Sequence, residues 1–149
     1  MEKIIKTAVY QLILNQQRAV LYSVGEKINI FDVSNNFNKV KVLDDLKNPN
    51  QVFYDEEYKI LITKNTTGGF AIYDLDSLDL LKKFKLKPNV SNTDFNFIYD
   101  KGNKTIYCIA SVSNDKKLGF DLIKIIYETT EIVYIPLKFE LEKNILSHY

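Results

Sequence analysis

The chain has 149 residues, of which 46% are hydrophobic and only 5 are glycine and 3 proline, so it is long enough to bury a core and is not a disordered or loop-rich chain. Its 20 basic and 19 acidic residues leave a net charge of +1, which provides no overall field to attract nucleic acid or an acidic membrane surface. No apolar run approaches the length of a membrane span. We expect no signal peptide, because Met1-Glu2-Lys3 leads into a strand pattern that becomes polar by Gln16.

The single cysteine, Cys108, excludes a disulfide within the chain and favours a reducing compartment. We therefore expect a cytoplasmic protein that binds neither nucleic acid nor membranes.

The first segment, about residues 4–43, alternates apolar runs with polar turns. The polar turn Asn15-Gln16-Gln17-Arg18 separates the first two runs, and asparagine favours turns because its side chain bonds to the nearby backbone. Short apolar runs joined by turns predict antiparallel strands. The predicted strands are Ala8–Leu14, Ala19–Tyr22, Ile28–Val33 and Val40–Leu43.

The second segment, about residues 49–86, repeats this order, with Asp55-Glu56-Glu57-Tyr58 as its first turn. Its last run alternates lysine with apolar residues, which is typical of a solvated edge strand whose lysines block edge pairing. We favour this interpretation over a stripe that binds nucleic acid. The predicted strands are Gln51–Tyr54, Lys59–Thr63, Phe70–Leu75 and Leu81–Leu86.

The third segment, about residues 93–137, has the same order again, and its first turn is Asp100-Lys101-Gly102-Asn103. The predicted strands are Phe95–Tyr99, Lys104–Ile109, Leu118–Leu122 and Ile132–Ile135. The tail, residues 138–149, alternates like a strand over Phe139–Lys143 and could be the first strand of a further unit.

An aromatic-aspartate pair marks the third run of each segment: Phe31-Asp32, Tyr73-Asp74 and Phe120-Asp121. The second aspartate follows the first by 42 residues, and the third follows the second by 47. A period in this range predicts four-stranded propeller blades. We expect each pair to end its strand and begin a hairpin.

The residues of the second segment also match a known pattern at several places. The matching positions are Pro49, Asp55, Thr63, Asn65 and Tyr73-Asp74-Leu75. The segment resembles blades of YVTN-type, lactonase-like and quinoprotein-like β-propellers, and tryptophan-aspartate repeat propellers are similar. The chain departs from the last group because it has no tryptophan and no Gly-His pair at the start of a blade. The resemblance implies a blade fold and assigns no catalytic residue.

We therefore expect an all-β single domain of about three four-stranded antiparallel blades, with a β-barrel or β-sandwich as the alternative. Three blades are too few to close a ring of four to eight. The outer faces of the first and last blades would then be exposed unless another protein surface packed against them.

No pattern in the sequence indicates an enzyme, a cofactor or a metal site. Cys108 lies inside an apolar run, and the only histidine, His148, lies next to the last residue. The run Asp74-Leu75-Asp76-Ser77-Leu78-Asp79 lacks the central glycine and final glutamate of a calcium loop, so we interpret it as a hairpin turn.

We accordingly expect a non-enzymatic protein-interaction scaffold, completed by self-association or as part of a longer propeller. The candidate contact loops are Val24–Lys27, Lys64–Gly69, Ser111–Lys117 and the crossing Asp44–Asn50. The candidate contact residues are Glu26, Lys27, Asp45, Asn48, Asn50, Asn65, Thr66, Thr67, Asn114 and Asp115.

Two alternatives remain open. A lactonase-like or other ligand- or metal-binding propeller would need polar ligands that converge from the crossings, namely Asp45, Asn48, Asn50 and Asn92. A small β-barrel carrier of an apolar ligand would need a closed sheet around an internal pocket.

Overall fold

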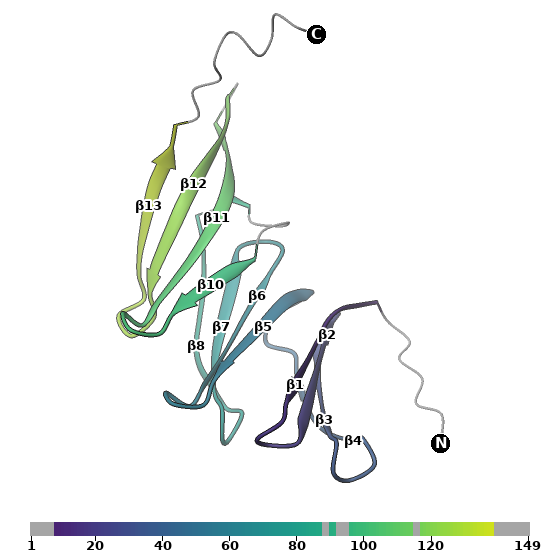
Figure 1. Ribbon diagram of the computed structural model, residues 1–149. Helices are drawn as coiled ribbons and strands as arrows, with labels where there is room; N and C mark the ends of the chain where they lie inside the picture. Colours follow the sequence, from purple (N-terminus) through teal and green to yellow (C-terminus); the bar gives the residue numbers. More distant parts are fainter. Residues whose placement is uncertain (1–7, 88–89, 92–95, 115–116, 139–149) are drawn as a thin grey trace, which may run out of the picture. The chain divides into compact units, whose positions relative to one another are not determined.

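The computed structural model describes residues 8–87, 90–91, 96–114 and 117–138 (Figure 1). These residues form β-strands and turns, and none of them belongs to a helix that could span a membrane. The chain divides into two compact units, residues 1–94 and 95–149. Each unit is described by itself.

The first unit contains two four-stranded antiparallel sheets, each with its strands in sequence order (Figure 1). The first sheet consists of β1 (Val9–Asn15), β2 (Val20–Gly25), β3 (Ile28–Asp32) and β4 (Asn38–Leu43). The second sheet consists of β5 (Pro49–Asp55), β6 (Ile60–Asn65), β7 (Gly69–Asp74) and β8 (Leu80–Lys85). A further short strand, β9, comprises Val90–Ser91.

The second unit contains a third antiparallel sheet in the order β10-β11-β12-β13. Its strands are β10 (Phe97–Asp100), β11 (Thr105–Asn114), β12 (Lys117–Ile126) and β13 (Glu131–Leu137). The predicted blade architecture, three four-stranded antiparallel sheets, is confirmed. In each sheet the first and last strands do not pair with each other, so none of the three closes into a barrel. The lysine-rich β8 is an edge strand, as its alternation predicts.

The turn between the first two strands has the same geometry in all three sheets. Asn15, Asp55 and Asp100 each accept a hydrogen bond through Oδ1 from the backbone N–H three residues later, at 3.2, 3.3 and 3.3 Å. The residue before the second strand then takes a positive φ. These residues are Ala19, Lys59 and Lys104, with φ of 52°, 56° and 48°. This turn, and not the aromatic-aspartate pair, is the feature that recurs without change.

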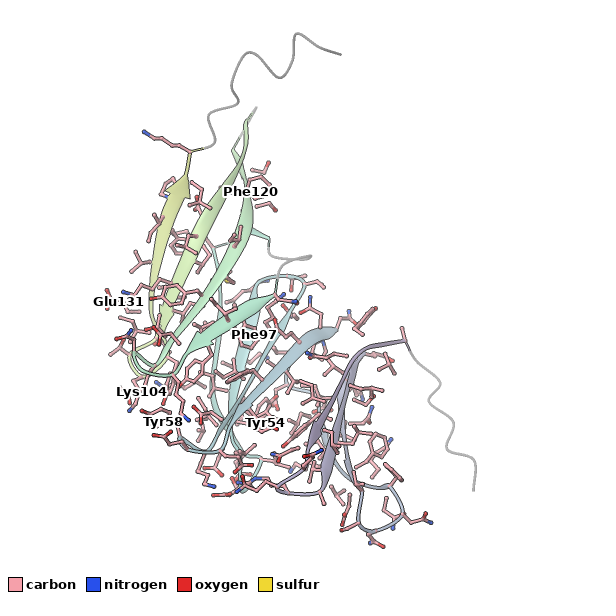
Figure 2. All side chains as sticks on the ribbon, viewed as in Figure 1. Tyr54, Tyr58, Phe97, Lys104, Phe120 and Glu131 are labelled. Atoms are coloured by element: carbon pink, nitrogen blue, oxygen red, sulfur yellow. The ribbon has the colours of Figure 1, made fainter. Side chains whose placement is uncertain are left out.

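The third aromatic-aspartate pair does not end a strand, so that prediction is wrong. Asp32 and Asp74 are the last residues of β3 and β7, and they pair with Val20 and Ile60 at the start of the second strands. In the third sheet Ile126 occupies this position, opposite Thr105, whereas Asp121 pairs with Ala110 in mid-strand. Figure 2 shows Phe120 far along β12 from the turn beside which Lys104 and Glu131 lie.

The reason for this difference is the length of the third hairpin. β11 and β12 each have 10 residues, against 6 in β6 and 6 in β7. The described part of the predicted loop Ser111–Lys117 is therefore strand, with Ser111 opposite Phe120 and Asn114 opposite Lys117. The third copy thus gains its extra residues by extending paired strands and not by lengthening a loop.

The core of the first unit lies between its two sheets. One face of the first sheet packs against the second sheet and against the β4–β5 crossing. The side chain of Tyr54 on β5, labelled in Figure 2, packs against this core. Apolar side chains at alternate strand positions produce this arrangement, because alternate residues point to one face of a sheet. The core residues are Tyr22, Val24, Ile28, Ile30, Leu43, Leu46, Val52, Leu61, Ala71, Tyr73 and Leu75.

Candidate interaction site

Three of the predicted contact loops meet at one end of the first unit. The backbone N–H of Asn48, in the crossing, donates to the carbonyl of Glu26 in the β2–β3 turn at 3.3 Å. The side-chain amide of Asn65, at the end of β6, donates to the carbonyl of Lys47 at 3.2 Å. These two bonds join the β2–β3 turn, the crossing and the β6–β7 loop. The structure therefore brings together the loops that carry Glu26, Lys27, Asp45, Asn48, Asn65, Thr66 and Thr67.

Asn65 organises the β6–β7 loop from a buried position. Its Oδ1 accepts hydrogen bonds from the N–H and hydroxyl groups of Thr67, at 3.1 and 3.2 Å, and from the N–H of Gly69 at 2.7 Å. A Cβ added at Gly69 would lie only 3.0 Å from this oxygen, so a larger residue there would have to displace the Asn65 amide. Only 7% of Asn65 is exposed, so its side chain shapes the loop from the inside.

A pocket of about 660 Å³ opens beside these loops; we call it the crossing pocket. One wall is the segment Asp44–Lys47 of the crossing, and another is the segment Lys83–Lys85 of β8. Asn65, Thr67 and Gly69 of the β6–β7 loop complete the lining. Two predicted contact residues besides Asn65, namely Asp45 and Thr67, therefore share a concave surface.

Tyr73 fixes one carboxylate of this pocket. Its hydroxyl group donates to Oδ2 of Asp45 at 2.9 Å. Burial and, after it, the acceptor carboxylate of Asp45 raise the pKa of the Tyr73 hydroxyl. The phenol therefore stays protonated as a donor at neutral pH, and it holds the Asp45 side chain in position.

The other predicted contact residues lie elsewhere or outside the described part. Asn50 lies in β5, and Asn114 is the last residue of β11 in the second unit. Asp115 and Asn92 lie outside the described residues. Among the residues that are described, no group of three or more histidine, cysteine, aspartate or glutamate side chains could hold a metal ion. Whether the ten predicted residues contact a partner stays a prediction.

At the opposite end of the first unit, Arg18 links the first turns of the two sheets. Its Nε and Nη2 donate to the two carboxylate oxygens of Glu56 at 2.6 and 3.0 Å, and Nη2 also donates to Asp76 at 2.6 Å. Asn15 donates to the same Glu56 carboxylate at 2.8 Å. The Arg18 guanidinium, with the further donors Asn15 and Lys59, lowers the pKa of Glu56 to about 2.

No motif in the sequence marks this cluster directly, although a signal for it exists. Arg18 and Glu56 occupy the same recurring turn in consecutive copies of the repeat, where corresponding turns of neighbouring sheets come close. Opposite charges in corresponding turns could therefore have predicted the pair.

The first sheet also has an exposed apolar face, which we call the first end face. Leu12 and Val42 lie on one cross-sheet row, since Leu12 pairs with Ser23, Ser23 with Asn29 and Asn29 with Val42. This face is opposite the one that carries the buried Tyr22 and Val24. Its most exposed members are Tyr10, Leu12, Leu14, Val40 and Val42, at 36–65% exposure.

The third sheet has a similar apolar face in the second unit. Ile98 pairs with Tyr107, and Ile109 pairs with Leu122, which pairs with Ile135, so these side chains share one side of the sheet. Ile98 is 69% exposed. A shallow pocket of about 240 Å³ on this side is lined by Asn96, Ile98, Tyr107, Cys108, Ile109 and Leu122.

No protein-family model matches the sequence, and no curated protein sequence matches it. Solved structures are similar in fold. The β-propeller domain of Cps50 (Swd1) from Myceliophteria thermophila aligns with a TM-score of 0.60 and 15% identity, over 97% of this chain and 43% of that chain. The WD40 repeats of RRP9 align with a TM-score of 0.52 and 8% identity, over 89% of this chain and 52% of that chain.

These similarities, at such low identity, concern the fold alone. Together with the three antiparallel sheets, they show that the chain has the fold of an incomplete β-propeller, as the repeat period predicts. The chain spans about half the length of the propeller chains to which it is similar.

Proposed function

We propose that this chain is a non-enzymatic protein-interaction scaffold whose ring of blades is completed by a second copy of the chain. The observation that carries the proposal is the first end face, where Leu12, Leu14 and Val40 lie exposed on a sheet whose other side is core. Blades of a propeller pack face to face, so an apolar outer face of a terminal blade fits another blade.

The energy available from this face is large. If it buried roughly 800 Å² on each side, as a standard interface does, with a little over half of that area apolar, covering it would contribute on the order of 10 kcal/mol. This is comparable to the whole net stability of a domain. Extended exposed apolar surfaces in soluble proteins mark interaction sites.

The test is the solution mass of the protein, measured by sedimentation across a range of concentrations. We expect a dimer for the natural sequence and a monomer for the double variant Leu12→Lys/Val42→Lys, because two ammonium groups on the first end face cannot be desolvated without partners. The matched control is Leu81→Lys on β8, which is also exposed, at 54%, but lies outside this face.

A natural-sequence protein that stays monomeric at every concentration would contradict completion by a second copy. Equal loss of association in the Leu81→Lys control would show that the effect does not arise from the first end face.

A further inference from the structure

We propose that the crossing pocket binds an extended peptide segment that carries a basic side chain near two acidic ones. The inference rests on the proposed role as a protein-interaction scaffold, but it concerns a surface other than the first end face. It follows from the size of the pocket, from the opposite charges of its walls and from the rigid loop beside it.

The walls of the pocket carry opposite charges that do not neutralise each other. The crossing wall carries Asp44, Asp45 and Lys47, so its carboxylates outnumber its ammonium group, and the β8 wall carries Lys83 and Lys85. None of these five side chains forms an ion pair with any described residue. The pocket between these two walls has a volume of about 660 Å³, which lies within the range typical of ligand sites.

This arrangement selects a ligand by its charge pattern. A uniformly acidic ligand gains attraction from the lysine wall and meets repulsion from the aspartate wall, and a uniformly basic ligand meets the reverse. A ligand that carries both signs matches the net charge of each wall. Like-charge repulsion disfavours ligands of a single sign, and this difference produces specificity.

The spacing of the lysines favours an extended peptide. Lys83 and Lys85 are alternate residues of β8, so their side chains leave the same side of the strand, roughly 7 Å apart along it. Two acidic residues at positions i and i+2 of an extended peptide have the same spacing. A basic residue nearby in the peptide would then face Asp44 and Asp45.

The remaining lining is held in place before any ligand arrives. Asn65 fixes the β6–β7 loop through three accepted hydrogen bonds, and Tyr73 fixes Asp45. Phe84 lies between the two lysines and stacks on Phe70, with ring centroids 5.3 Å apart. A site whose groups are already ordered loses less conformational entropy on binding.

The experiment is fluorescence anisotropy on the full chain with three labelled eight-residue peptides. The dipolar probe is Ala-Lys-Ala-Ala-Glu-Ala-Glu-Ala; the other two replace its charged residues by glutamate only or by lysine only. We expect the dipolar probe to bind about tenfold more tightly than either uniform probe. A labelled oligothymidine serves as a polyanion that is not a peptide.

The decisive variant is Lys83→Glu/Lys85→Glu, for which we expect the dissociation constant of the dipolar probe to rise about tenfold or more. The matched control is Lys39→Glu/Lys41→Glu, the same charge change at two exposed lysines on the edge strand β4. A second variant, Asp44→Lys, should make the glutamate-only probe the tightest ligand.

The proposal is overturned if the dipolar probe binds no better than the uniform probes, if the β4 control weakens binding equally, or if oligothymidine displaces the peptide. Sedimentation of the same samples separates this result from the proposed function. A monomer that still binds the dipolar probe contradicts only the second-copy assembly, and a dimer that binds no peptide contradicts only the pocket.

Discussion

Arg18 joins the two sheets of the first unit through a charged cluster that few other residues could replace. Its planar guanidinium donates to both oxygens of Glu56 and reaches Asp76 and the carbonyl of Leu75. Lysine has no such fork of donors and could not make these bonds together. The cluster is partly buried, with 24% of the Arg18 side chain and 19% of the Glu56 side chain exposed.

The substitution Glu56→Gln should lower the free energy of unfolding at pH 7 by about 2 kcal/mol, after allowance for partial exposure. Since the pKa of Glu56 is about 2 in the folded protein and about 4.5 without its partners, this stabilisation is complete above pH 4.5 and is lost as the pH falls toward 2. Denaturant titrations at several pH values measure it. The variant should show a shallower acid dependence, and Glu26→Gln, at an exposed site, should behave like the natural sequence.

Ala19 is held in a left-handed backbone conformation, with φ of 52°. Alanine in this conformation has a steric penalty that glycine does not have. Part of the stability that glycine adds is lost, because glycine also raises the conformational entropy of the unfolded chain. We expect Ala19→Gly to stabilise the protein by about 0.5 kcal/mol. Thermal melting would contradict this if Ala19→Gly were destabilising or if Ala8→Gly, at an exposed residue before β1, had the same effect.

At the scale of elements, the hairpin after the third strand of each sheet is tightened by an aspartate in the first two sheets and by a threonine in the third. Where Asp32 and Asp74 end β3 and β7, each Oδ1 accepts backbone N–H groups two and three residues later, which tightens the hairpin. In the third sheet Thr129 serves this turn instead, through a bond at 3.3 Å from the N–H of Glu131.

This difference predicts unequal effects for one substitution at two similar sites. Asp74→Ala should lower the melting temperature, because two backbone N–H groups lose an acceptor, whereas Asp121→Ala should leave it nearly unchanged. Calorimetry of both variants measures this. A larger loss for Asp121→Ala would contradict the register of β12.

The strands and first turns could be predicted because their causes are local. An aspartate or asparagine side chain acts on N–H groups two or three residues away, so Asn15, Asp55 and Asp100 mark their turns in the sequence itself. The length of the third hairpin could not be predicted in this way. It depends on pairs such as Ala110 with Asp121, which are far apart in the chain, and an aspartate in mid-strand has the same neighbours in sequence as one at a strand end.

The candidate site was predictable only in part, for the same reason. Asp45, Asn65 and Thr67 could be named because they lie in polar loops. The alternation around Lys83 and Lys85 indicates only edge protection, and the other wall that makes them part of a pocket comes from the β4–β5 crossing, about 40 residues earlier in the chain. Arg18 and Glu56 are likewise joined only by the packing of two sheets.

At the scale of the whole molecule, assembly and stability should be linked. If two copies complete the ring, the folded state is favoured by mass action, and a hundredfold rise in protein concentration adds up to about 2.7 kcal/mol. We therefore expect the melting temperature to rise with concentration for the natural sequence. The Leu12→Lys/Val42→Lys variant should melt at a temperature independent of concentration; a constant value for both proteins would contradict the linkage.

The only cysteine of the chain is buried in β11, within the second unit, while the first unit contains none. Only 3% of Cys108 is exposed, so we expect a thiol-reactive dye to modify it much faster when that sheet opens, and the labelling rate then reports the opening of this unit alone. Spectroscopic melting, by contrast, senses both units at once. Comparing the labelling rate of Cys108 with the spectroscopic melting curve therefore shows whether the two units unfold together or one after the other.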